Sequence, residues 1–100
     1  MVKYQLKRLN QRDGYFLEPS NNDFPYIDFR IRSVRNGNSK IIEKRIRYKI
    51  SEHNFKTLDE ELLDTADDFN EADILTYELA VNYAKGKELE FIETLRGRTM

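Results

Sequence analysis

The spacing of apolar residues changes near residue 57 of this 100-residue chain. Before that point apolar and polar residues alternate, which is the period of a strand with one solvated face. After it, apolar residues recur at intervals of three and four, which is the period of an amphipathic helix. We therefore predict one α+β domain over residues 1–100: an antiparallel sheet of about four strands in two hairpins, followed by two C-terminal helices packed on one face.

The charge of the chain divides at the same place. Residues 1–56 hold 13 Lys and Arg against 6 Asp and Glu, whereas residues 57–100 hold 4 against 12. The net charge of −1 hides this division. We expect a basic β half over residues 1–52 and an acidic α half over residues 57–97, so that the domain carries two surfaces of opposite charge.

The clearest predicted element is a hairpin formed by residues 26–35 and 38–50. Asn36-Gly37 lies between the two runs and favours a type I′ turn, which pairs residues whose numbers sum to 73. A four-residue loop would keep the same faces, whereas a three-residue loop would place isoleucines opposite charges, and we disfavour it. The expected apolar face consists of Ile27, Phe29, Ile31, Ile42, Ile46, Tyr48 and Ile50.

Two shorter strands are expected before this hairpin. Tyr4 and Leu6 alternate with polar residues in the first, and Asp13-Gly14 signals a tight turn before the second. Pro19 ends the second strand. The loop from Pro19 to Pro25 follows it, and we expect this loop to add shape-dependent contacts to a partner.

The acidic half is predicted to begin with a helix at Thr57. Thr57 and Glu60 have the spacing of a capping box. At 100° per residue, leucines occupy one arc of this helix and carboxylates the opposite arc. The carboxylates on that arc are Glu60, Glu61, Asp64, Asp67 and Asp68.

A second helix is predicted after Asn70, which has the position of its cap. This segment is apolar on nearly all sides and needs cover from more than one direction. We favour its continuation past Gly86, since one interior glycine costs only about 1 kcal/mol; a final strand from Leu89 to Ile92 is the alternative. A heptad-like stripe within residues 74–95 also suggests a homodimer: Ile74, Tyr77, Val81, Ala84, Glu88, Phe91 and Leu95.

The face of the hairpin opposite the isoleucines is basic. It would present five cations, Arg30, Arg32, Arg45, Arg47 and Lys49. Two carboxylates, Asp28 and Glu43, share this face. Five cations on one ribbon could follow the phosphates of DNA or RNA. Single-strand recognition would also need exposed aromatic rings for base stacking, for which Tyr26 shares this face and Phe16 is a further candidate. The ordinary alternative is a solvated sheet face whose arginines also protect its edges from aggregation. A third alternative is that some of these arginines pair with the acidic helices, which would leave a smaller external patch.

Enzymatic chemistry has little support in the sequence. His53 has no expected catalytic partner, there is no cysteine, and the four glycines form no phosphate-binding loop. Asp28 and Glu43 share one sheet face and could hold Mg²⁺, but the flanking arginines favour ion pairs. We therefore predict no catalytic, cofactor-binding or metal-binding residues.

The expected location is the cytoplasm. No apolar run exceeds three residues, whereas a membrane-spanning helix needs about 20. The first six residues alternate in polarity, unlike a signal peptide. The lack of cysteine is also typical of intracellular proteins.

These features favour a small non-enzymatic binding protein. We expect it to modulate or inhibit a larger, nucleic-acid-handling protein with a basic surface, through the acidic helical arc. The alternative is direct DNA or RNA binding by the basic hairpin face. A solvated helix face remains the ordinary reading of the acidic arc.

Overall fold

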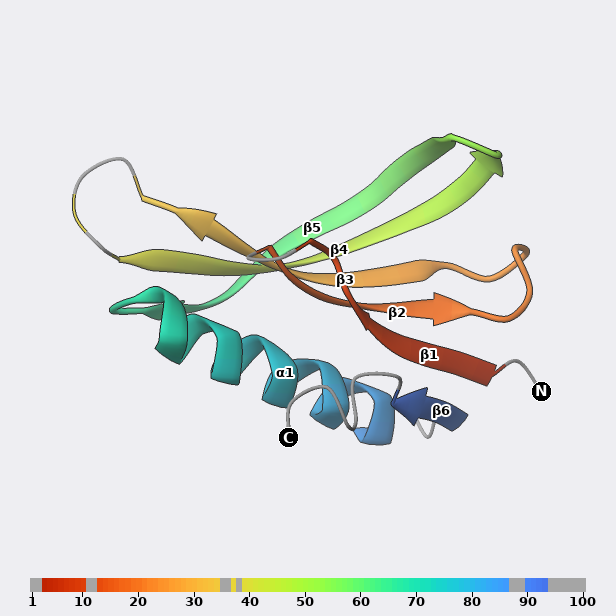
Figure 1. The fold of residues 1–100 in the computed structure, drawn as a ribbon. Helices are drawn as coiled ribbons and strands as arrows, with labels where there is room; N and C mark the ends of the chain where they lie inside the picture. The colour runs from red at the N-terminus through yellow and green to blue at the C-terminus, as the bar shows by residue number, and fades with distance from the viewer. Residues whose placement is uncertain (1–2, 11–12, 35–36, 38, 87–89, 94–100) are drawn as a thin grey trace.

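The computed structural model describes residues 3–10, 13–34, 37, 39–86 and 90–93 (Figure 1). Its elements are β1 (Lys3–Arg8), β2 (Gly14–Pro19), β3 (Tyr26–Ser33), β4 (Lys40–Ser51), β5 (Asn54–Ala66), α1 (Phe69–Gly86) and β6 (Glu90–Glu93). The strands form one sheet in the order β5-β4-β3-β2-β1-β6. All neighbouring strands are antiparallel except β1 and β6, which are parallel.

The predicted α+β class is confirmed, but the division between strands and helices differs. β1 to β5 follow one another as an antiparallel meander. The chain then passes along one face of the sheet as α1 and adds β6 at the opposite edge (Figure 1). Among the described residues there are therefore five antiparallel strands and one helix, rather than about four strands and two helices.

The predicted register of the central hairpin is confirmed. Ile31 pairs with Ile42, and Ile27 pairs with Ile46, so that the residue numbers sum to 73. Gly37 has a φ of 90°, as the second position of a type I′ turn requires. Asn36 lies outside the described residues. The alternation of the two runs and the turn sequence together specify this register.

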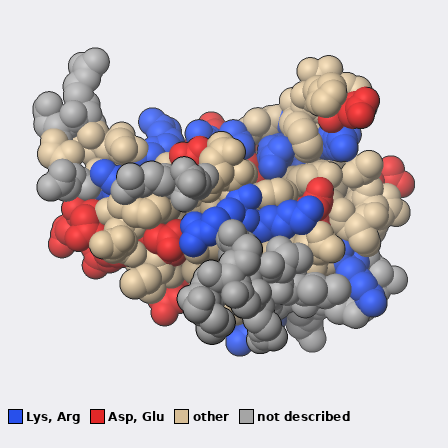
Figure 2. All heavy atoms as spheres, viewed as in Figure 1, with Lys and Arg blue, Asp and Glu red and all other residues tan. Residues whose placement is uncertain are grey.

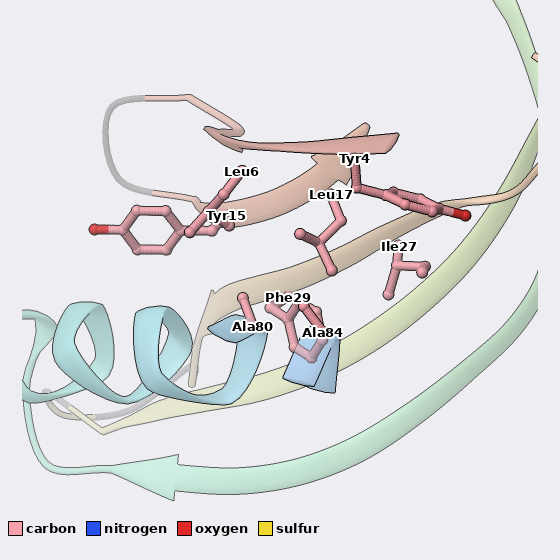
Figure 3. Packing of buried hydrophobic residues seen from close by; sticks show 8 residues of the cluster. All are labelled: Tyr4, Leu6, Tyr15, Leu17, Ile27, Phe29, Ala80 and Ala84. Carbon is pink, nitrogen blue, oxygen red and sulfur yellow. The ribbon is translucent and has the colours of Figure 1, made fainter. Parts of the chain in front are cut away.

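The main core lies between α1 and the sheet (Figure 3). On its helix side, α1 presents small residues at intervals of four, which let the helix approach the strands closely: Ala72, Thr76, Ala80 and Ala84. The Thr76 hydroxyl donates to the Ala72 carbonyl at 2.9 Å, so this buried polar group is satisfied. The sheet contributes Tyr4, Leu6, Tyr15, Leu17, Ile27 and Phe29.

The predicted isoleucine face is only partly covered. Ile27, Ile31 and Ile42 are buried, but Ile50 is 66% exposed. α1 contacts β2 and β3 more extensively than β4 and β5. The distal end of the β4 and β5 hairpin extends beyond the part of the sheet that the helix covers (Figure 1).

The predicted helix from Thr57 is wrong, because residues 54–66 form β5. Ile42 pairs with Asp64 and Glu43 with Leu62, so Leu63 is an extra residue in the strand, and Leu58 is extra in the same way. These bulges interrupt the alternation of the strand. The resulting spacing of leucines matches a helix, and the β region therefore extends to Ala66 instead of ending near residue 52.

The boundaries predicted for the second helix are also wrong. Asp68, not Asn70, caps α1: its Oδ1 accepts from the Glu71 amide at 2.9 Å. Glu71 Oε1 in turn accepts from the Asp67 amide at 2.7 Å. α1 ends at Gly86 and β6 (Glu90–Glu93) follows, so the alternative of a final strand from Leu89 to Ile92 is confirmed over residues 90–92. The remainder of the predicted continuation, residues 87–89 and 94–97, lies outside the described residues.

Tyr15 joins the sheet to α1 and gives the fold an expected sensitivity to alkali. Its hydroxyl donates to Asp73 Oδ2 at 3.3 Å, and Arg8 Nη1 lies 3.1 Å from Asp73 Oδ1. Burial first, and then the Asp73 charge, raise the pKa of Tyr15 from 10.0 to about 12. The neutral hydroxyl therefore contributes stability below pH 10, which is lost as pH rises through the folded-state pKa.

We expect the wild-type protein to lose about 2 kcal/mol more unfolding free energy than Tyr15→Phe between about pH 9 and pH 12. Urea unfolding of both proteins across this range measures the difference. The two proteins differ only in the Tyr15 hydroxyl, so the comparison isolates this group. Parallel pH profiles for the two proteins would contradict the assignment.

Candidate functional site

The predicted acidic residues do not share one helical arc. Glu60, Glu61 and Asp64 lie on β5, and Asp67 and Asp68 lie in the turn to α1. Because successive strand residues point to opposite faces, Glu60 and Glu61 separate. Glu60 lies 3.4 Å from Arg30 on the face away from α1, called here the outer face. Glu61 lies 3.2 Å from Lys44 on the helix side.

These carboxylates nevertheless remain in one strongly acidic region. From Thr57 to Ala84 the sequence holds nine Asp and Glu and no Lys or Arg. Glu60 and Glu61 keep 54% and 55% of their side-chain surface exposed despite their ion pairs. We call the exposed members from β5 to the first turn of α1 the acidic edge: Asp59, Glu60, Glu61, Asp64, Asp67, Asp68 and Glu71.

The backbone of β5 also has one side without a neighbouring strand among the described residues. Among the described residues, β5 pairs with β4 alone and forms one edge of the sheet. Each of its 13 residues except Leu63 and Ala66 is exposed. An edge strand presents unpaired N–H and C=O groups along its free side. The longest regular run of β5 is Asp59–Leu62, which lies between the bulges at Leu58 and Leu63.

The predicted basic face is present, but most of its charge is already compensated. Arg30 and Arg32 bind Glu43, at 3.8 and 2.8 Å. Lys49 forms no ion pair within the part of the chain that is described. Two further arginines, Arg45 and Arg47, bind the third carboxylate of the face, Asp28.

Asp28 is the centre of this outer face. It is fully buried although it points away from the helix. Its Oδ2 accepts from Arg45 Nε and Arg47 Nε, both at 2.7 Å, and Arg45 Nη2 lies 2.6 Å away. Its Oδ1 has no hydrogen-bond partner among the described residues. Two guanidinium groups therefore share one carboxylate oxygen.

Aromatic rings cover the Asp28 ion pairs. The Arg47 guanidinium lies 4.3 Å from the centroid of the Phe55 ring and 5.1 Å from that of Tyr26. Phe16 stacks on Tyr26 with a centroid distance of 6.4 Å. The sequence analysis missed Phe55, because it predicted that a helix begins two residues later, at Thr57. The available signal was the spacing of Phe55 and Thr57, since residues two apart lie on the same face of a strand. The cluster excludes water from charges that would otherwise face solvent.

The two predicted poles of opposite charge are therefore only partly present. Lys and Arg are interspersed with Asp and Glu across the face shown in Figure 2. Arginines on β3 and β4 bind carboxylates of the same sheet face. The acidic edge is the more distinct of the two predicted surfaces, because it retains several carboxylates without a cationic partner among the described residues: Asp59, Asp64 and Asp67.

The residues considered for catalysis lie apart. His53 is exposed in the tight turn between β4 and β5. Asp28 and Glu43, considered for Mg²⁺, both bind arginines. Among the described residues no three His, Cys, Asp or Glu side chains are grouped to hold a metal ion.

A hollow of about 470 Å³ is lined by Asp13, Ile31, Ser33, Lys40 and Phe69. It contains none of the residues considered for catalysis.

Among the described side chains of the apolar stripe predicted for a homodimer, all except Ile74 pack within the chain. Tyr77 and Val81 pack against the core, and Ala84 is buried. Ile74 is 59% exposed. The dimer through residues 74–95 stays a prediction, and α1 offers it little of the expected surface.

Comparison with known proteins gives no relative from which a function could be transferred. No protein-family model, curated protein or solved structure matches the chain. No described helix is long and apolar enough to cross a membrane. Function is therefore inferred from the geometry and charge of the acidic edge and the outer face.

Proposed function

We propose that this chain is a small non-enzymatic binding protein that captures a larger partner through the acidic edge. The observation that carries this proposal is the coincidence of two features on β5: an edge with no neighbouring strand among the described residues, and a group of exposed carboxylates within residues 59–64. The complementary partner has a basic surface. Such surfaces are typical of proteins that handle nucleic acids, so capture would modulate or inhibit nucleic-acid binding.

The exposed charges of the acidic edge favour selective and fast association more than high affinity. Exposed carboxylates are screened by salt over a distance of about 8 Å at physiological ionic strength. Their main effects are faster association and the rejection of acidic partners. Asp59 and Asp64 have no cationic partner among the described residues, so they are free to meet Lys or Arg from another protein.

Charge reversal at Asp59 and Asp64 should remove partner capture. We expect Asp59→Lys with Asp64→Lys to weaken binding about 100-fold, because two attractions become repulsions. The matched control is Glu52→Lys with Glu78→Lys, which makes the same charge change at exposed positions outside the acidic edge and outside the loop from Pro19 to Pro25. The measurement is a pull-down from nuclease-treated host extract with each tagged protein, followed by titration of the captured partner.

The control pair should capture the same partner as the wild type. Equal capture by the edge variant and the control variant would contradict the proposal. Loss of all capture after nuclease treatment would instead favour direct nucleic-acid binding.

Direct nucleic-acid binding by the outer face is the second candidate. Its support is the combination of two residues: Lys49, which has no ion pair in the described structure, and Phe55, which is 36% exposed and lies beside Arg47. A cation next to an accessible ring is the arrangement that binds single strands. Its test is a low-salt gel shift with Arg32→Glu and Lys49→Glu, which leave the Asp28 ion pairs intact. Retention by wild type and loss in this variant would favour the second candidate.

A further inference from the structure

We propose that β5 receives an extended Lys- and Arg-rich segment of the partner as an additional strand of the sheet, along Asp59–Leu62. This inference rests on the proposed function and specifies how the partner binds. Recognition by strand addition uses main-chain hydrogen bonds for affinity and alternating side chains for specificity. β5 provides both.

The backbone of Asp59–Leu62 can pair with a second strand on its free side. These residues pair in unbroken register with Ile46 to Glu43 of β4 on one side. No described strand lies on the other side. β4 is itself paired with β3, so the run is held extended before a partner arrives. The bulges at Leu58 and Leu63 interrupt the register and limit the regular docking length to this run.

The side chains of this run define the incoming segment. Asp59 and Glu61 point to the helix side, and Glu60 and Leu62 point to the outer face. A strand added next to them would place its side chains about 5 Å away on each face. Lys or Arg residues suit the helix side, where both neighbours are acidic. The outer face suits one cation and one apolar residue, since Leu62 is 62% exposed.

The same charges disfavour a second copy of the chain on this edge. Antiparallel pairing of β5 with β5 would place Asp and Glu opposite Asp and Glu, which is destabilising. Charged side chains protect natural edge strands from self-association in this way. Charge repulsion therefore disfavours pairing of the acidic edge with a second copy of the chain, whereas charge attraction favours its pairing with a cationic strand.

A lysine peptide separates strand addition from simple charge attraction. The probe is a peptide of about nine residues that alternates lysine and threonine, because it has high strand propensity and no acidic residue. Its matched control has the same side chains with every backbone amide methylated, which removes the hydrogen-bond donors. We expect methylation to weaken binding at least about tenfold. Amide chemical shifts of the wild-type protein should change mainly within residues 54–66.

Each outcome of this experiment decides a different point. Equal binding of the two peptides, or shift changes confined to the outer face, would overturn strand addition. Equal binding that is lost in Asp59→Lys with Asp64→Lys would leave the charge-based function intact. Absence of peptide binding would overturn strand addition, and the pull-down with the edge and control variants would then decide the proposed function separately.

Discussion

Replacement of Gly14 by alanine is expected to destabilise the fold by about 4 kcal/mol. Gly14 has a φ of 107°, which L residues with a side chain rarely adopt. A Cβ there would overlap the Phe29 carbonyl oxygen and lie 3.1 Å from the Phe29 carbonyl carbon. These are backbone atoms of the neighbouring strand, so they cannot move aside without breaking the pairing of β2 with β3.

The other described glycines provide a graded control. Gly37 has a φ of 90° but nothing within 4 Å of an added Cβ, so Gly37→Ala should cost about 1 kcal/mol from backbone strain alone. Gly86 ends α1 with open space around it, and Gly86→Ala should change stability by less than about 1 kcal/mol. Urea unfolding of the three variants measures this order. Similar stabilities for Gly14→Ala and Gly37→Ala would show that the close approach to Phe29 is not tight.

Asp28→Ala is the second substitution with a large expected effect, about 3 kcal/mol. It removes the single carboxylate that Arg45 and Arg47 share, and their side chains are only 24% and 14% exposed. Two partly buried cations would then face each other without compensation. The loss is a large part of the total stability of a domain of this size.

Glu18→Ala is the matched control for this effect. Glu18 forms an ion pair with Lys7 on the same sheet, but the two side chains are 30% and 39% exposed. Exposed pairs contribute about 0 to 1 kcal/mol, so this variant should remain close to wild type in the same unfolding experiment. If Asp28→Ala lost no more stability than Glu18→Ala, the buried cluster would not stabilise the outer face.

The central hairpin could be predicted from sequence because two independent signals agree there. Alternating isoleucines require one buried face, and Asn36-Gly37 requires a short turn. Either signal alone leaves several registers open. Together they give the pairing of Ile31 with Ile42 that the structure has.

β5 could not be recognised in the same way. Its bulges at Leu58 and Leu63 shift the leucines out of alternation, and Thr57 and Glu60 imitate a helix cap. Most of β5 is also exposed, so no buried face imposes a period of two on it. The exposed surface of an edge strand leaves a weaker sequence pattern than a strand inside a sheet.

The candidate site was predictable in composition but not in shape. The carboxylates at Glu60, Glu61 and Asp64 are exposed as expected, but they line a strand and not a helix. The burial of Asp28 depends on Phe16 and on Phe55, which lie far from it in sequence. No local pattern indicates such cover, because it forms only when the strands assemble.

The most direct test of the acidic edge is amide hydrogen exchange of this protein with and without the partner that it captures. Recognition at the acidic edge predicts slower exchange in residues 54–71, with little change in β2 and β3. In the free protein, the amides on the unpaired side of β5 should exchange rapidly, since they face water. Slower exchange across β2 and β3 with β5 unchanged would contradict recognition at this edge.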